Sequence, residues 1–272
     1  MRISTSDFSL RHTLECGQFF RYYPEGNGYF VLAGDKILRL EQSGGRLAVA
    51  GKADTDSVKA LLGLGDNYPH IISGISKDPF ISAAIRQSYG LRLMRQEPWE
   101  CMISYICSAN SSVGKVRFCV NRISENFGKK ISFEGREYYG FPRKLDATEK
   151  ELRECGLGYR AAHLARTLES VSPAEVRRLA RLGYQDAKER LMELDGIGDK
   201  VADCIALYSL GFPQAFPVDR WVGRVMKEQY IRQKANYRQI SSFAAEYFGH
   251  YAGYAQQFLF NFRRPGQPAT ER

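Results

Sequence analysis

The stretch from Leu191 to Asp219 constrains the fold of this chain most strongly. Within it, two short helical patterns flank the turn Asp-Gly-Ile-Gly-Asp at residues 195–199. Such a turn directs backbone amides at the start of the second helix outward, where they can bind a phosphate. We interpret residues 186–209 as a helix-hairpin-helix, a unit that contacts a DNA phosphate without reading the base sequence. A plain tight connection between two helices is the alternative for its two glycines taken alone.

Two side chains in this stretch are candidates for chemistry, and a third lies beside them. Lys200 falls in the first turn of the second helix, whose positive end disfavours a charged ammonium and favours the neutral amine. Because the neutral amine is nucleophilic, Lys200 is a candidate nucleophile. An ordinary surface charge is the alternative. Cys204 lies one turn further along the same face. Asp219 follows Pro217 and precedes another helical pattern, which suits a helix N-cap. A carboxylate fixed there and facing Lys200 could also stabilise positive charge that develops on a sugar.

The N-terminal third of the chain has the pattern of a sheet. Residues 18–50 alternate between aromatic or β-branched runs and turn residues, which predicts an antiparallel meander. Its hairpin turns are predicted at residues 27–28, 34–35 and 44–45. Helical spacing begins at about residue 54, so we expect residues 1–89 to form a mixed N-terminal domain.

Residues 90–272 predict a helical body that contains the helix-hairpin-helix. Pro98 can begin a helix that is apolar nearly all round as far as Ala109, as expected of a buried central helix. Residues 129–146 have no clear period and are expected to be a connecting loop, and the tail at residues 263–272 is expected to be frayed. The predicted fold class is α+β, with an N-terminal antiparallel sheet packed on the helical body.

The formal net charge of +9 favours a polyanionic partner such as nucleic acid or an acidic membrane surface. The longest apolar runs are too short to span a bilayer, and the N-terminus lacks the apolar stretch of a secretory signal. We therefore expect no membrane association and a soluble location, cytoplasmic and nucleoid-associated in a prokaryote or nuclear in a eukaryote. The six cysteines include no C-x-x-C pair and the four histidines stand far apart, so no catalytic metal is expected.

The segment LDGIGDKVADCIALYSLGFPQAFPVDRW resembles the signature of the helix-hairpin-helix DNA glycosylases that carry a Gly/Pro-rich loop and a catalytic aspartate. More narrowly, it is similar to the 8-oxoguanine DNA glycosylase family. Four further segments support the narrower resemblance, which extends over nearly the whole chain. They are GQFFRY at 17–22, RQEPWECMISYICSANSS at 95–112, YYGFP with GLGYRA within 138–161, and YAQQFLF at 254–260.

This resemblance implies roles for the residues that contact the damaged nucleoside. Lys200 would be the nucleophile that attacks C1′, and Asp219 the carboxylate that supports it. The carbonyl of Gly17 would accept a hydrogen bond from N7–H, a donor that 8-oxoguanine has and guanine lacks. Gln256 would bind the pairing edge of the extruded base. The two faces of that base would be covered by Phe260 and Cys204.

The resemblance also implies a set of DNA contacts. Asn110 would fill the vacated space, Tyr159 would wedge into the stack and Arg160 would hydrogen-bond the orphaned cytosine. Lys115 stands where relatives have an arginine that helps to enforce the opposite cytosine, so discrimination of the opposite base is expected to be weaker. Trp221 stands where vertebrate-type members have a phosphate-contacting histidine, so this contact is expected to differ. The hairpin glycines implied in phosphate binding are Gly196 and Gly198.

The function expected from the resemblance is excision of 8-oxoguanine from duplex DNA through a lysine imine, followed by β-elimination at the abasic site. The expected partner is double-stranded DNA containing oxidised guanine, and a monomer is expected. No cysteine follows Cys204, so no iron–sulfur cluster is expected, although backbone carbonyls of the hairpin could bind a structural ion. Two alternatives stay open: a related glycosylase for an oxidised pyrimidine or alkylated purine, and a DNA-binding protein without catalysis.

Overall fold

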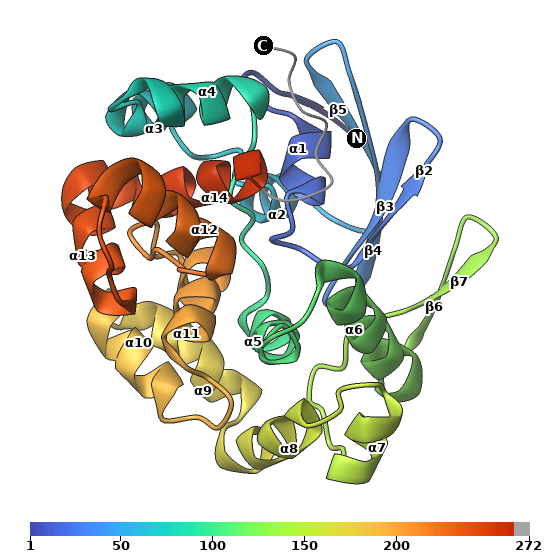
Figure 1. Cartoon of the computed structure of the whole chain (residues 1–272). Helices are drawn as coiled ribbons and strands as arrows, with labels where there is room; N and C mark the ends of the chain where they lie inside the picture. The colour runs from blue at the N-terminus through green and yellow to red at the C-terminus, as the bar shows by residue number, and fades with distance from the viewer. Residues whose placement is uncertain (264–272) are drawn as a thin grey trace.

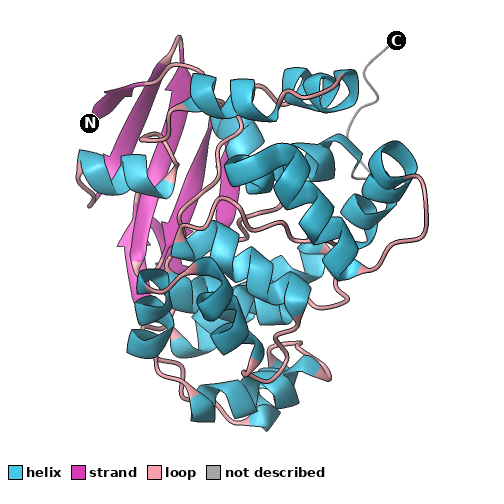
Figure 2. Ribbon diagram, turned by 90° about the vertical axis from the view of Figure 1, so that its left-hand side faces the viewer, coloured by secondary structure: helices cyan, strands magenta, loops and turns pink. Residues whose placement is uncertain are grey.

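A computed structural model describes residues 1–263 of the chain. The strands lie on one side of the molecule and most of the helices on the other (Figures 1 and 2). One sheet is fully antiparallel, with strand order β1-β5-β4-β3-β2, which confirms the predicted meander and adds a short first strand that was not predicted. Its strands are β1 Arg2–Ser4, β2 Tyr22–Glu25, β3 Gly28–Ala33, β4 Lys36–Ser43 and β5 Arg46–Gly51.

Two of the three predicted hairpin turns are confirmed, at residues 34–35 and 44–45. The first turn was placed one residue too late, since it consists of Gly26 and Asn27. Gly28 belongs to β3 and pairs with Glu25, and a Cβ atom there would lie 2.5 Å from the Leu40 carbonyl oxygen. This glycine is therefore required by the close approach of two strands and not by the turn.

Four helices accompany the sheet: α1 Leu10–Glu15, α2 Thr55–Leu61, α3 Tyr68–Ile75 and α4 Pro79–Gln87. One core lies between the sheet and the first two of these helices. Leu14 and Val58 are buried there against Val31, Leu40 and Leu47. Helices α3 and α4 instead pack on the last helix, α14 Ala252–Arg263, which lies beside them in Figure 1. The predicted domain boundary at residue 89 stays a prediction.

The helical body is built around α5 Pro98–Cys107, which is buried along its whole length. This confirms the predicted central helix. The helices around it are α6 Val113–Phe127, α7 Glu149–Glu154, α8 Arg160–Ser170, α9 Pro173–Arg178, α10 Tyr184–Met192, α11 Asp199–Ile205, α12 Arg220–Val225 and α13 Tyr237–Phe248. Short 3₁₀ or π turns extend four of the elements: η1 Leu179–Arg181, η2 Ala206–Leu210, η3 Met226–Ile231 and η4 Gly249–Tyr251.

The prediction of a structureless loop at residues 129–146 is wrong. This segment contains a hairpin of two short strands, β6 Lys130–Phe133 and β7 Arg136–Tyr139. Glu134 and Gly135 both have positive φ, as a two-residue hairpin turn requires. Alternate apolar side chains pack against the sheet, and Phe133 meets Phe30 edge to face at 6.1 Å between ring centroids. Four-residue strands are too short to produce a recognisable period in the sequence.

A buried ion pair fastens the sheet to the central helix. Arg21 lies 3.1 Å from Glu100 of α5, and both side chains are almost fully buried. Glu100 also accepts a hydrogen bond of 2.7 Å from the Gly34 amide, while Arg21 donates to the Tyr139 carbonyl at the end of β7. Three elements distant in the sequence therefore meet at α5, whose C-terminal end leads into the candidate site.

No helix within residues 1–263 is long and apolar enough to cross a bilayer. Except for Arg263, which ends α14, the tail predicted to be frayed lies outside the described residues.

Candidate active site and DNA interface

The predicted helix-hairpin-helix is formed by α10, the turn that follows it and α11. Gly196 adopts φ of +78°, and a Cβ atom on it would lie 2.8 Å from the Cβ of His163 on α8. Glycine is therefore required there. Gly198 is the N-cap of α11, and a Cβ atom on it would meet no atom of the described chain within 4 Å. Space is thus open where the amides at the start of α11 would meet a phosphate.

Helix α8 braces the hairpin turn. The Thr167 hydroxyl donates a hydrogen bond of 2.8 Å to the Asp195 carbonyl, and the Asp195 carboxylate lies 2.5 Å from Nδ1 of His163. Arg166 also donates to this carboxylate. These neighbours hold the pKa of Asp195 below its usual value, with the Arg166 bond as the largest cause. The turn is therefore fixed to the same helix that begins with Arg160.

Lys200 lies in the first turn of α11, as predicted. Its Nζ donates a hydrogen bond of 3.2 Å to Oγ of Ser108, the C-cap residue of α5, and lies 5.3 Å from the ring centroid of Tyr105. The rest of the helix is anchored by Val201 and Cys204, which are buried. The amine is therefore held at the junction of the central helix and the hairpin.

Asp219 is the N-cap of α12, which confirms the structural role expected from the sequence. Its Oδ1 accepts a hydrogen bond of 2.8 Å from the Val222 amide. Burial raises the pKa of Asp219 above its usual value, although the Val222 amide and the Lys200 amine oppose that rise. The carboxyl group thus combines a fixed position with partial removal from water, close enough to Lys200 to interact with its charge.

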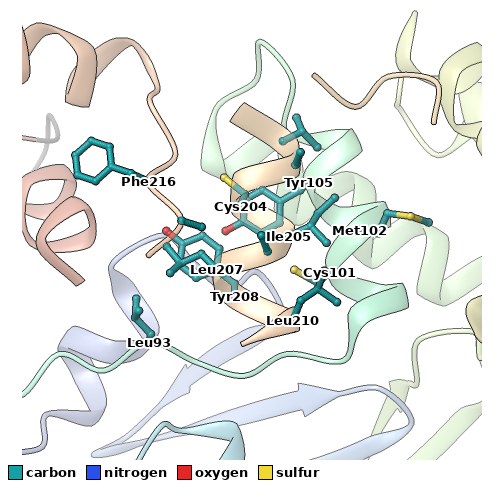
Figure 3. Packing of buried hydrophobic residues seen from close by; sticks show 14 of the residues in the cluster. Leu93, Cys101, Met102, Tyr105, Cys204, Ile205, Leu207, Tyr208, Leu210 and Phe216 are labelled. Atoms are coloured by element: carbon teal, nitrogen blue, oxygen red, sulfur yellow. The ribbon is translucent and has the colours of Figure 1, made fainter. Parts of the chain in front are cut away.

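One pocket brings together all the residues implied in contact with the damaged nucleoside. It contains both candidate catalytic residues and the four candidate base-binding residues, which come from segments more than 200 positions apart. Side chains of the central helix and of η2 complete its wall, and Figure 3 shows Tyr105, Cys204 and Tyr208 at this junction. The lining residues are Gly17, Phe20, Tyr105, Ser108, Ser111, Val113, Val116, Lys200, Cys204, Tyr208, Pro217, Asp219, Gln256, Gln257 and Phe260.

A glutamine pair joins α14 to the base-binding side of this pocket. The Tyr208 hydroxyl lies 3.3 Å from Oε1 of Gln256 and donates a hydrogen bond of 2.5 Å to Oε1 of Gln257. Nε2 of Gln257 then donates to the Cys16 carbonyl at 3.1 Å. The next residue, Gly17, has φ of +88°, a conformation that favours glycine.

The Cys204 thiol on the pocket wall is uncharged. Burial raises the pKa of Cys204 to about 12, so its thiol is neutral at neutral pH.

Three of the expected DNA contacts lie together at the rim. Arg160 donates hydrogen bonds of 2.5 Å to the Ala109 carbonyl and 2.9 Å to the Asn110 carbonyl. Asn110 adopts φ of +48°, unusual for a residue with a side chain, and its amide lies 3.4 Å from the Tyr159 hydroxyl. The Tyr159 ring is 51% exposed. A strained loop and an exposed aromatic ring are thus held at one edge of the helical body.

The remaining two expected contacts come from α6 and α12. Lys115 is on α6, with its amine 4.7 Å from the ring centroid of Phe118. Trp221 is on α12, where the Arg224 guanidinium lies 5.3 Å from its ring. Within the described chain, the pocket lining includes neither of them, nor the rim residues, nor the hairpin glycines. The structure therefore separates a pocket from a wider surface around it.

Several pocket residues were not predicted. Ser108 belongs to a polar run that stands out after the apolar central helix, and this contrast was a usable signal. Tyr208 continues the four-residue spacing of Lys200 and Cys204, and Gln257 directly follows Gln256.

Among the described residues, no group of three or more His, Cys, Asp or Glu side chains is placed to hold a metal ion. A structural ion on the hairpin carbonyls stays a prediction.

Comparison with known proteins links these features to one family. A family model described as the N-terminal domain of 8-oxoguanine DNA glycosylase matches residues 1–102. A probable N-glycosylase/DNA lyase of Methanothermobacter thermautotrophicus is 34% identical over 69% of this chain and 68% of the relative. An N-glycosylase/DNA lyase of Arabidopsis thaliana is 30% identical over 98% of this chain and 80% of the relative.

Solved structures extend the likeness to the whole fold. The 8-oxoguanine glycosylase/lyase of Clostridium acetobutylicum superposes with a TM-score of 0.89 at 31% identity, over 96% of this chain and 97% of the other. That structure is a complex with double-stranded DNA containing cytosine opposite 8-oxoguanine.

Proposed function

The chain belongs to the 8-oxoguanine DNA glycosylase/lyase family, and we propose that the pocket between α5, α11 and α14 carries out its reaction with Lys200 and Asp219. The function is removal of 8-oxoguanine from duplex DNA, followed by cleavage of the strand at the abasic site. The observation that carries the proposal is the convergence of an amine, a carboxylate and four base-binding residues on one pocket.

The reaction begins when the damaged nucleotide leaves the base stack, which costs a few kcal/mol. The neutral amine of Lys200 attacks C1′ and the bond from C1′ to N9 breaks, so the base departs with the bonding electrons and takes up a proton. The partly buried carboxylate of Asp219 stabilises the positive charge that develops on the sugar. Ring opening then leaves an imine between Lys200 and C1′.

Strand cleavage follows from this imine. The positively charged imine acidifies the proton on C2′, and its removal allows the bond from C3′ to the 3′ phosphate oxygen to break. Hydrolysis of the remaining imine returns Lys200 to its amine form. One side chain therefore serves both base removal and β-elimination.

Four residues would read the base. The Gly17 carbonyl is proposed to accept a hydrogen bond from N7–H, which distinguishes 8-oxoguanine from guanine. Gln256 would pair with the edge of the base that normally faces cytosine. Cys204 and Phe260 would cover its two faces, for which a neutral thiol and an aromatic ring are suited. Their shared presence in one pocket supports this assignment.

The surface around the pocket would hold the duplex. Amides beside Gly196 and Gly198 would bind a phosphate, and Trp221, at the start of α12, would make a further contact with the duplex. Asn110, Tyr159 and Arg160 would occupy the gap and contact the orphaned base. Lys115 would approach the same strand. These contacts agree with a net charge of +9 and with the duplex bound by the Clostridium acetobutylicum protein.

We further propose that the chain acts as a monomer on chromosomal DNA, at the nucleoid of a prokaryote or in the nucleus of a eukaryote. The sequence supports action without an iron–sulfur cluster, since no cysteine follows Cys204.

Borohydride trapping tests the nucleophile. Reduction of the imine on a duplex with 8-oxoguanine opposite cytosine should link the protein covalently to DNA. The adduct should be absent from Lys200→Gln and present in Lys150→Gln, a control at an exposed lysine of α7. Trapping by Lys200→Gln would show that the nucleophile is misassigned.

A panel of lesion duplexes tests the substrate. It should show excision of 8-oxoguanine well ahead of oxidised pyrimidines and alkylated purines, and the reverse order would favour another glycosylase of the superfamily. Binding to duplex DNA without excision of any of these lesions would favour a DNA-binding protein without catalysis.

A further inference from the structure

Two exposed aromatic rings flank the turn at residues 156–158, and each has a cation beside it. The Arg160 guanidinium lies 4.6 Å from the ring centroid of Tyr159, and the Lys115 amine lies 4.7 Å from that of Phe118. The two rings are about equally exposed, Tyr159 at 51% and Phe118 at 50%. Tyr159 has a proposed place in the base stack, whereas Phe118 has no role in the function described so far.

Phe118 is held against a glycine that leaves room for it. Gly156 has φ of +87°, and a Cβ atom there would lie 2.7 Å from Cε1 of Phe118 and 3.0 Å from Nζ of Lys115. Lys115 and Phe118 are three residues apart on α6, so they share one side of the helix. The next residue, Cys119, donates from Sγ to the Gly156 carbonyl at 3.3 Å. The ring and the amine therefore have fixed places although Phe118 is 50% exposed.

The two aromatic and cation pairs belong to one charged surface. Burial raises the pKa of the Cys119 thiol, and Lys115 and Arg160 both oppose that rise, so both cations lie within electrostatic range of the same sulfur atom. The turn that carries Gly156 continues directly into Tyr159 and Arg160. The two pairs therefore lie on either side of this turn, near the same buried thiol.

A single exposed apolar side chain on a protein surface is ordinary and needs no explanation. Phe118 differs because its ring lies beside a cation and packs against Gly156, which stands three residues before a second cation–aromatic pair. We call the side chains of Lys115, Phe118, Tyr159 and Arg160 the strip. Alternating aromatic and basic side chains suit a nucleic acid strand, whose bases and sugars pack on rings and whose phosphates attract cations. The strip lies on the side of the pocket where Arg160 is proposed to meet the orphaned base.

We propose that Phe118 is a DNA contact, which packs on a nucleotide next to the orphaned base in the strand opposite the lesion and steadies the Lys115 amine toward that strand. The inference rests on the proposed function, because it requires a lesion duplex along this rim. A lysine on a flexible stem reads an opposite base less rigidly than the planar guanidinium of arginine. The ring of Phe118 restricts that stem and so supports the preference for cytosine.

The first test measures binding to a duplex with a stable abasic analogue opposite cytosine. Phe118→Ala should weaken binding about fivefold or more, as expected for loss of an aromatic contact with a nucleotide. Phe118→Tyr keeps the ring and should restore affinity, and the control Leu182→Ala removes another exposed apolar side chain, outside the lining of the pocket described above. Affinity of Phe118→Ala within about twofold of the parent would overturn the proposal.

A second measurement separates binding from chemistry. At limiting protein, single-turnover excision opposite cytosine by Phe118→Ala should fall in proportion to the loss of affinity. The ratio of excision opposite cytosine to excision opposite adenine should fall. If binding and this ratio are both unchanged, Phe118 is only a surface residue.

The third test uses the unaltered protein and so does not depend on the folding of a variant. A 5-iodouracil placed at each position beside the orphaned cytosine should form a photochemical crosslink to Phe118 from one of them. Crosslinks to Phe118 from the lesion strand alone, or from neither strand, would contradict the proposal. Failure of the parent to excise 8-oxoguanine would instead contradict the proposed function, while the crosslink would still report on Phe118.

Discussion

The Tyr237 hydroxyl donates a hydrogen bond of 2.5 Å to the carboxylate of Asp203, which is completely buried. Asp203 lies on α11 three residues after Lys200, while the Tyr237 oxygen also accepts from the amide of Val218 at 3.4 Å. Val218 directly precedes Asp219. This chain of contacts therefore joins the helix that carries the amine to the segment that carries the carboxylate.

Removal of the Tyr237 hydroxyl should slow catalysis more than it weakens DNA binding. In Tyr237→Phe the ring remains, but the link between Asp203 and the Val218 amide is lost, and small displacements of reacting groups are costly. We expect single-turnover excision about tenfold slower with a nearly unchanged dissociation constant, and a stability loss of about 1–2 kcal/mol. Tyr247→Phe is the control, because its hydroxyl donates to Asp78 and neither residue lines the pocket. Equal rates for the two variants would refute a positioning role.

Asp203 itself should be a major determinant of stability. It accepts hydrogen bonds from Tyr184 at 2.6 Å and Lys188 at 3.0 Å as well as from Tyr237. Asp203→Ala leaves the largely buried Lys188 ammonium with Asp199, at 3.3 Å, as its remaining carboxylate partner, and breaking such a pair costs up to about 3–5 kcal/mol. Chemical denaturation should show this loss. The double variant Asp203→Leu with Lys188→Met should recover much of it, and failure to recover would assign the loss to packing instead of charge.

The hairpin glycines should differ sharply when replaced by alanine. Gly196→Ala introduces a Cβ atom at 2.8 Å from His163 in a conformation with positive φ, so we expect a loss of about 1–3 kcal/mol. Gly198→Ala meets no described atom within 4 Å and has negative φ, which makes it the matched control. The melting temperature should fall for Gly196→Ala and stay close to that of the parent for Gly198→Ala. If the two variants behave alike, the turn is less constrained than its geometry indicates.

The sequence predicted those parts of the site that depend on local rules. A glycine turn before a helix and an aspartate after a proline can each be recognised from a few neighbouring residues. The structure confirms both the hairpin and the Asp219 N-cap. The side chains implied by resemblance share one pocket. Ser108 and Gln257 were missed because their roles come from partners about 92 and 241 positions away, a hydrogen bond from Lys200 and one to Cys16. The β6–β7 hairpin was missed because packing on Phe30 stabilises strands that have almost no pattern of their own.

The pH dependence of base excision should report on Asp219. Burial raises the pKa of this carboxyl, so its charged form is lost at a higher pH than for an ordinary aspartate near 3.9. Because the proposed reaction requires the charged form, single-turnover excision should decline as the pH falls through that raised pKa. Asp219→Asn keeps a good N-cap for α12, so its melting temperature should stay close to that of the parent while excision falls by orders of magnitude.

The acid limb of the rate profile distinguishes this role from a structural one. In Asp219→Asn the residual rate should no longer decline over that pH range, since the titrating group is absent, and DNA affinity should change little. The contribution of Asp219 to folding stability depends on pH in the opposite direction to the excision rate. A carboxyl group with a raised pKa binds its proton more tightly in the folded state than in the unfolded state. Its stabilising contribution is therefore present at low pH and lost as the pH rises through the raised pKa. A decline of activity at low pH in both parent and variant would therefore place the responsible group elsewhere in the pocket.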